Sequence, residues 1–251
     1  MRAAFVIFDG MTALDFVGAY DPLGRLRTMG VLPDFEWSVC ATTGTVADDR
    51  GLRFLPDLVG GSLERFDLLV VPGGHGTRAL RHDPAFVAWL RTAAGVPLKA
   101  SVCTGALLLG AAGFLAGKPA TTHPSARREL EPYCGEVRSE RVVDAGGVVT
   151  AGGVTAAIDL GLHLVRRLAG AEAMRRLARQ MDYPHLSDLA RAADGPTRGF
   201  PFGRVDNEKL LAVVRWGAGN RMSLQDKFSL AWGGVAGRRN AVPRQGSAAV
   251  L

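Results

Sequence analysis

The sequence predicts an α/β protein with a mostly parallel sheet that carries helices on both faces. Residues 2–8 and 66–71 are almost continuously apolar and show no alternation of polar and apolar side chains. Such runs are typical of parallel strands that are buried on both faces. Segments with helical character alternate with the strands along the chain, which is the second observation that favours this fold class.

Five strands and two hairpins are expected. The first strand ends at the dipeptide Asp9-Gly10, and the hairpin at residues 142–150 turns at a pair of glycines. Residues 46–55 form a second hairpin or a loop, with a charged turn that ends in Gly51. The expected strands are residues 2–8, 35–42, 66–71, 98–102 and 119–122.

Six helices are expected between and after the strands. Thr12 is a suitable cap for the first, because threonine hydroxyls accept hydrogen bonds from free N–H groups of the first turn. Pro84 stands in the first turn of the second helix, where its missing N–H has no intrahelical partner to lose. Gly170 separates the last two helices. The expected helices are residues 12–29, 84–94, 104–113, 125–130, 155–168 and 171–181.

The length and the charge distribution predict one large domain with an appendage. The chain has 251 residues, of which 47% are hydrophobic and 22% are charged, as in ordinary globular proteins. The net charge of +6 comes from residues 195–251, which carry nine basic and three acidic side chains, whereas residues 1–194 are balanced. We expect a folded domain over residues 1–190 and a basic, glycine-rich, weakly structured tail over residues 191–251. A neutral domain gives no reason to expect nucleic acid as a partner.

The sequence contains no recognisable membrane anchor or secretion signal. Its apolar start ends at Asp9, too early for the core of a signal peptide, and no apolar run reaches 18 residues. The three cysteines are an odd number and lack the spacing of a metal site. We therefore expect free thiols in a cytoplasmic protein, with no metal and no membrane partner.

Residues 97–113 carry the strongest chemical signal. A short buried strand, residues 98–102, is followed at once by Cys103 and then by an apolar helix from Thr104. A nucleophile between a strand and a helix is typical of a nucleophile elbow, which strains the backbone and exposes the side chain above the sheet. The helix N-terminus also favours a thiolate. We predict a cysteine enzyme with Cys103 as its nucleophile.

Three loops are expected to meet at the carboxyl ends of the strands, where open α/β sheets bind their ligands. The loops are residues 9–15, residues 73–76 and the turn at Cys103. Gly73 and Gly74 would let backbone N–H groups approach a substrate, and with the N–H of Thr104 they could form an oxyanion hole. The alternative is that these glycines only make a tight turn.

Asp15 and His123 are candidate partners of the cysteine. Asp15 lies in an apolar helical start, where a carboxylate is costly unless it is paired or protonated. It is either a general acid and base that shares a proton with Cys103, or a first-turn carboxylate favoured by the helix dipole. His123 either forms a catalytic Cys–His pair or is a structural histidine bonded to the backbone. His75 is expected at the mouth of the pocket.

Five motifs stand in a fixed order over about residues 1–183. The motifs are residues 8–18, 71–76, 101–110, 120–123 and 150–159. Together they resemble the DJ-1/PfpI superfamily, and within it most closely the isocyanide (isonitrile) hydratases. Five spaced motifs are specific for the superfamily and less specific for one activity.

The resemblance implies a flavodoxin-like sandwich of the kind shared with class I glutamine amidotransferases, a homodimer and a small-molecule substrate. It implies Cys103 as nucleophile, Asp15 as its acidic partner and Thr104 beside the thiolate. The expected pocket residues are Gly73, Gly74, His75, His123 and Val154. The implied reaction is hydration of an isocyanide to an N-substituted formamide through a Cys103 thioimidate, with Asp15 as general acid and base and without a cofactor.

Three departures from the family pattern bear on the activity. Thr104 stands where PfpI-type peptidases and the chaperone and glyoxalase branch have a histidine, which argues against a Cys-His-Glu protease triad. His123 is followed by proline, as in DJ-1 itself, whereas hydratases more often have an aromatic residue there. Residues 183–185 begin like the family segment that covers the pocket of the partner subunit, and the sequence then diverges.

Two other functions stay open. One is a DJ-1-type glyoxalase III or deglycase that acts on 2-oxoaldehydes. The other is a non-enzymatic redox-sensing or regulatory domain in which a low-pKa Cys103 is oxidised. Regulators that fuse this fold to an AraC-type helix-turn-helix pair have a longer C-terminal part than residues 195–251, so no such fusion is expected.

Overall fold

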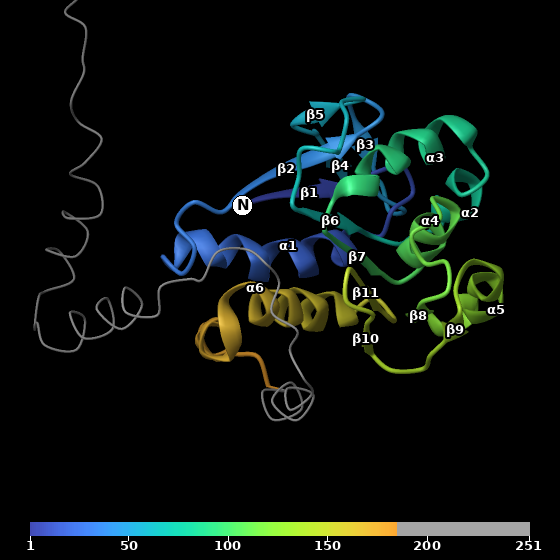
Figure 1. Cartoon of the computed structure of the whole chain (residues 1–251). Helices are drawn as coiled ribbons and strands as arrows, with labels where there is room; N and C mark the ends of the chain where they lie inside the picture. Colours follow the sequence, from blue (N-terminus) through green and yellow to red (C-terminus); the bar gives the residue numbers. More distant parts are fainter. Residues whose placement is uncertain (185–251) are drawn as a thin grey trace, which may run out of the picture. The chain divides into compact units, whose positions relative to one another are not determined.

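A seven-stranded sheet forms the centre of the fold (Figure 1). The computed structural model describes residues 1–184. The strands of the sheet are β1 (Arg2–Val6), β2 (Glu36–Ala41), β5 (Leu58–Val59), β6 (Leu68–Val71), β7 (Leu98–Val102), β10 (Val142–Asp144) and β11 (Val148–Ala151). Their order is β10-β11-β7-β6-β1-β2-β5, and all neighbours are parallel except β10 and β11. The predicted α/β class with a mostly parallel sheet is confirmed.

The three central strands bring the functional loops together. β6 lies between β1 and β7, with Phe5 beside Val70 and Val70 beside Ala100. Apart from Arg2, every residue of these strands is buried, which agrees with the apolar runs of β1 and β6, while β7 buries Lys99 and Ser101 as well. Because the strands are parallel, the loops that follow them leave the same edge of the sheet.

Two smaller sheets lie outside the main one. β3 (Val46–Ala47) and β4 (Arg53–Phe54) pair antiparallel, so the hairpin is the correct one of the two alternatives expected for residues 46–55. β8 (Pro119–Ala120) pairs with β9 (Glu136–Val137) instead of extending the main sheet. Two-residue strands such as β5 and β9 carry too little pattern to be predicted from sequence.

The helices form layers against the sheet (Figure 1). They are α1 (Ala13–Thr28), α2 (Thr77–Leu80), α3 (Pro84–Arg91), α4 (Gly105–Ala111), α5 (Arg127–Leu130) and α6 (Ala156–Gln180). α1 and α6 lie side by side, and glycines permit their close approach. A methyl group at Gly18 would lie 2.6 Å from the Cβ of Ala157. Short 3₁₀ turns occupy Thr92–Gly95, Pro124–Ala126 and Glu131–Tyr133.

Two details of the helices bear on the sequence predictions. Gly170 has φ 88° and ψ 170° inside α6 and separates its two segments at the predicted residue. Thr12 precedes α1, but its hydroxyl does not cap the helix. It instead donates to Asp49 Oδ2 at 3.2 Å, because the turn of the β3–β4 hairpin lies against the loop after β1. The predicted capping bond was therefore wrong, although the helix begins where expected.

The predicted C-terminal tail, residues 191–251, lies outside the described residues. The helices that we would expect there, at residues 207–214 and 223–231, lie outside them too. Within residues 1–184, no helix combines the length and the hydropathy that crossing a membrane requires.

Candidate active site

Cys103 occupies a strained turn between β7 and α4. Its φ of 54° lies in the left-handed region, which costs a non-glycine residue about 1–3 kcal/mol unless neighbouring groups impose it. The backbone N–H of Cys103 donates to the carbonyls of Ala151 and Gly152, at 3.0 and 2.8 Å. The Thr122 hydroxyl donates to the Cys103 carbonyl at 2.8 Å. These bonds hold the strained strand–turn–helix geometry at Cys103, and the role of Cys103 as a nucleophile stays a prediction.

Glycines let the neighbouring loops pack directly against this turn. A methyl group at Gly105 would lie 2.4 Å from the carbonyl oxygen of Val71. At Gly73 it would lie 2.5 Å from the backbone nitrogen of Thr104 and 2.7 Å from the Cβ of Cys103. Contacts of this length are prohibitive, so the sequence needs glycine at both positions.

Replacing Gly73 with alanine is expected to displace the turn at Cys103. Because the added methyl group overlaps backbone atoms that cannot move independently, we expect a loss of about 1–3 kcal/mol in the free energy of unfolding. Displacement of the nucleophile should also lower turnover by at least about tenfold. Chemical denaturation and steady-state kinetics measure the two effects.

Gly95→Ala is the matched control for this substitution. Gly95 is exposed, and a methyl group there meets no atom of the described residues within 4 Å. A Gly73→Ala protein with the stability and turnover of the Gly95→Ala protein would contradict the packing argument.

Asp15 approaches the cysteine from the first turn of α1. Its side chain is fully buried, and Oδ2 accepts a hydrogen bond from the Gly73 N–H at 2.9 Å. The other carboxyl oxygen, Oδ1, is buried and has no hydrogen-bond partner among the described residues. The Cys103 thiol is nevertheless near enough to lower the pKa of the Asp15 carboxyl. Burial raises the pKa of Asp15 to about 7, against the lowering effect of the Gly73 N–H and the thiol. At neutral pH this carboxyl can therefore both give and take a proton.

The surroundings of the Cys103 sulfur favour its protonated form. Burial, with a further contribution from the Asp15 charge, raises the pKa of Cys103 to about 12. The N–H and hydroxyl of Thr104 act in the opposite direction and are weaker. These effects favour the thiol over the thiolate expected from the helix terminus, because α4 has only seven residues and its N-terminus does not outweigh desolvation and a neighbouring carboxylate. A nucleophilic role for this sulfur would require transfer of the thiol proton, and Asp15 is the carboxyl beside it.

The predicted oxyanion hole is also corrected by the structure. The Gly73 N–H is bound to Asp15, and the Gly74 N–H donates to Thr104 Oγ1 at 2.9 Å. The same hydroxyl lies 3.1 Å from the Gly74 carbonyl, to which it can donate. The two glycine amides therefore position the carboxyl and the threonine, and they are not free to bind an oxyanion.

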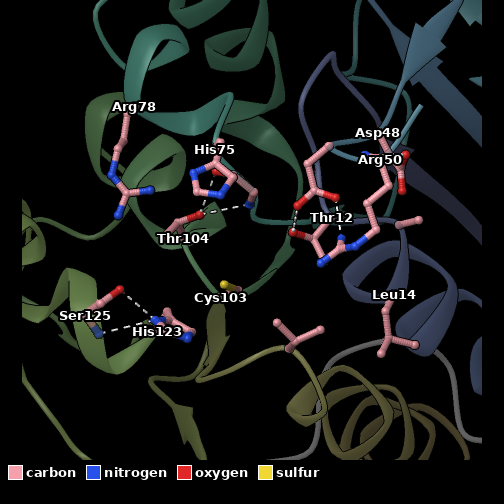
Figure 2. A pocket seen from close by; sticks show the side chains of 14 residues that line it. Thr12, Leu14, Asp48, Arg50, His75, Arg78, Cys103, Thr104, His123 and Ser125 are labelled. Atoms are coloured by element: carbon pink, nitrogen blue, oxygen red, sulfur yellow. Dashed lines mark hydrogen bonds and ion pairs between the residues drawn. The ribbon is translucent and has the colours of Figure 1, made fainter. Parts of the chain in front are cut away.

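A pocket of about 520 Å³ opens above Cys103 (Figure 2). This volume suits a small organic molecule. Cys103 is only 6% exposed and lies at the centre of the view. Asp15 and Gly73 do not line the pocket and lie beneath its surface. The lining residues are Thr12, Ala13, Leu14, Asp48, Asp49, Arg50, Gly74, His75, Arg78, Cys103, Thr104, His123, Ser125 and Val154.

The structure places the other predicted pocket residues at this cavity. His75 is exposed, and Val154 lies in the turn just before α6. His123 Nδ1 accepts a hydrogen bond from the Ser125 N–H at 3.2 Å and lies 2.8 Å from the Ser125 hydroxyl. This nitrogen therefore caps the turn at residues 124–126, in agreement with the structural alternative for His123.

Four residues that line the pocket were not predicted from the sequence to be near Cys103: Asp48, Asp49, Arg50 and Arg78. Asp48, Asp49 and Arg50 were assigned only to a turn, but the turn is joined to the loop after β1, where Asp49 N–H donates to Met11 O at 2.9 Å. Arg78 was missed because α2 has only four residues. The only feature of the sequence that could have indicated these pocket residues is the cluster of charged side chains in the turn at residues 48–51.

The cysteines and possible metal ligands complete the description of the site. All three cysteines carry free thiols, as expected. In residues 1–184, no group of three His, Cys, Asp or Glu side chains lies close enough together to hold a metal ion.

The fold and the site together define a flavodoxin-like α/β sandwich with a cysteine at a strained turn between a strand and a helix, where a buried carboxyl from the first helix lies beside it. The family description "DJ-1/PfpI family" matches residues 1–167. The chain belongs to this family.

The chain is similar in sequence to known proteins that differ in function. It is 36% identical to an isonitrile hydratase of Pseudomonas putida, over 73% of this chain and 78% of that protein. It is 30% identical to the HTH-type transcriptional regulator CdhR of Pseudomonas aeruginosa, over 88% of this chain but only 62% of the regulator. A crystal structure of a THiJ/PfpI family protein from Pseudomonas syringae has a TM-score of 0.66 and 29% identity, and 86% of each chain is covered.

Proposed function

We propose that the protein is a cysteine-dependent hydratase that adds water to an isocyanide and releases an N-substituted formamide. One observation carries the proposal: a fully buried carboxyl, whose pKa burial raises to about 7, lies beside the Cys103 thiol at the base of a small pocket. The similarity to an isonitrile hydratase supports the choice of reaction.

The first stage forms a covalent intermediate. The Asp15 carboxylate takes the thiol proton while the Cys103 sulfur bonds to the terminal carbon of the isocyanide. The same proton then passes from Asp15 to that carbon, which gives a thioimidate. The carbon is attached to the sulfur beside Asp15, so the proton moves only a short way. A soft, polarisable sulfur suits an electrophilic carbon of this kind.

The second stage releases the product. Water adds to the thioimidate carbon, with its hydroxyl on carbon and its proton on nitrogen. The C–S bond then breaks while the hydroxyl proton moves through Asp15 to the sulfur, which leaves the formamide and restores the thiol. The Thr104 N–H, which interacts with the sulfur, stabilises the leaving thiolate. The cycle consumes one water and needs no metal or organic cofactor.

Incubation of the full chain with phenyl isocyanide tests the proposal. We expect formanilide to accumulate in proportion to enzyme concentration, with multiple turnovers detected by chromatography. If formanilide does not form but methylglyoxal is consumed, the hydratase proposal fails in favour of a glyoxalase or deglycase. If neither compound is consumed and Cys103 is oxidised by dilute peroxide, a redox-sensing role is favoured.

We further propose that this enzyme works in the cytoplasm as a homodimer. The side chains of Leu14, at the edge of the pocket, and Val17 are 47% and 42% exposed on α1. Such neighbouring exposed apolar groups on a helix favour contact with a second copy of the chain.

A further inference from the structure

We propose that the preferred substrate carries an anionic group, such as a carboxylate, and that Arg78 binds it. The inference rests on the proposed hydratase function for the reacting end of the substrate. It extends that function by assigning the chemistry of the other end.

The pocket has two chemically different sides. In Figure 2, Arg78, His123 and Ser125 lie on one side of Cys103, and Arg50, Thr12 and Leu14 lie on the other, with His75 above the cysteine. The Arg78 side presents hydrogen-bond donors around the cavity, whereas the opposite side combines an arginine with two carboxylates and an apolar side chain.

The Arg78 side has a surplus of positive charge. Arg78 lies 3.2 Å from one oxygen of Glu129, and Arg81 lies 2.8 Å from the other. One carboxylate therefore serves two guanidinium groups. The Arg78 side chain is 40% exposed, against 18% for Arg81, and only Arg78 of the two lines the pocket. Since guanidinium has five N–H groups and this pair uses one Arg78 nitrogen, donors remain for a ligand.

The neighbouring side chains add to this donor surface. His123 Nδ1 accepts the Ser125 N–H, so a neutral His123 ring carries its proton on Nε2 and is a donor there. A carboxylate has only acceptor atoms and matches a guanidinium in geometry as well as charge.

The opposite side does not offer an equivalent anion site. Arg50 is paired with Asp49, and Asp48 lies beside them. The Asp48 carboxylate accepts the backbone N–H groups of Arg50 and Leu52, at 2.9 and 2.7 Å, and keeps its negative charge in the turn. Two carboxylates against one arginine repel an anion, so the charge distribution orients an anionic group towards Arg78.

A carboxylate-bearing aryl isocyanide satisfies these requirements. Its isocyanide carbon would meet Cys103, and its carboxylate would meet Arg78. We expect kcat/KM for para-isocyanobenzoate to exceed that for phenyl isocyanide, with a preference that weakens as salt is added.

Arg78→Gln and Arg81→Gln make a matched pair of test variants. Both remove one guanidinium from the same Glu129, but only Arg78 lines the pocket. We expect Arg78→Gln to lower the ratio of kcat/KM for the anionic over the neutral isocyanide by about 10- to 100-fold, as for the loss of a hydrogen bond to a charged group. Arg81→Gln should leave that ratio within about twofold, because surface ion pairs contribute little. Equal ratios for both variants and the wild type would overturn the inference.

Measuring the binding of the two formamide products tests the anion site at Arg78 separately from the proposed hydration reaction. Calorimetry with para-formamidobenzoate and formanilide measures the anionic preference without turnover. Absence of isocyanide hydration together with tighter binding of the anionic compound, lost in Arg78→Gln, would reject the reaction and keep the anion site. Hydration of phenyl isocyanide without any preference for the anionic compound would keep the reaction and reject the anion site.

Discussion

Replacing Cys103 with alanine is expected to lower kcat/KM for isocyanide hydration by about a thousandfold or more. The proposed route passes through a bond between the sulfur and the isocyanide carbon, and no neighbouring group in the pocket replaces that bond. Cys103→Ser should be nearly as inactive, because a hydroxyl is a weak nucleophile and Asp15 is too weak a base to ionise it. Steady-state kinetics with phenyl isocyanide measures both losses.

Cys134→Ala is the matched control for these variants. Cys134 is a half-buried free thiol, and it does not line the pocket. Its replacement should leave kcat/KM within about twofold. Mass spectrometry of a reaction quenched early should show the thioimidate adduct on Cys103 only. Undiminished hydration by Cys103→Ala would remove the basis for the nucleophile elbow argument.

Asp15→Asn is expected to lower kcat by about a hundredfold to a ten-thousandfold, because the amide cannot accept the thiol proton. In the proposed reaction, the wild-type protein reacts with Asp15 ionised and Cys103 protonated. Turnover should therefore rise with pH through about 7, the pKa to which burial raises Asp15. The variant should lack that rise. A pH profile that keeps the same rise in Asp15→Asn would assign it to another group.

The Asp15→Asn variant also tests the raised pKa of the buried carboxyl through the pH dependence of the free energy of unfolding. Asp15 has a pKa of about 7 in the folded protein and 3.8 as its ordinary value, so the folded state holds the proton more tightly than the unfolded state. Stability contributed by the protonated carboxyl is complete below pH 4 and is lost as pH rises towards 7, by about 1.4 kcal/mol per pH unit. Above pH 7 the loss stays constant.

Asp15→Asn has no such titration. Its free energy of unfolding, relative to that of the wild type, should increase between pH 4 and pH 7 and then stay level. Denaturation curves at several pH values check this result and show that the inactive variant is folded. A constant difference between the two proteins across this range would mean that the carboxyl is not held in its protonated form.

The parts of the fold that follow from local pattern could be predicted from the sequence. The apolar runs at β1 and β6 have few alternatives to buried parallel strands, because both faces of the segment are apolar. Cys103 stood out because a small nucleophile directly separated a strand pattern from a helix pattern. Asp15 stood out because a carboxyl in an apolar segment needs a physical reason.

Properties that depend on contacts between distant segments could not be predicted. The sequence shows two glycines in the loop after β6, but not that their amides bind Asp15 and Thr104. It shows a helix after Cys103, but not that burial outweighs the helix terminus in setting the pKa of the thiol. Arg78 lacked any pattern, since its four-residue helix matters only through the cavity beside it.

The bond between Asp15 and the Gly73 N–H joins positions 58 residues apart, and it has a consequence for the newly made chain. The carboxyl reaches the thiol only after β1, β6 and β7 have assembled in their final order. Before that stage, Cys103 is an exposed thiol with an ordinary pKa of about 8.5, and it ionises far more readily than in the folded protein. The nucleophile is therefore most exposed to oxidants and alkylating agents during synthesis and refolding, and completion of the sheet protects it.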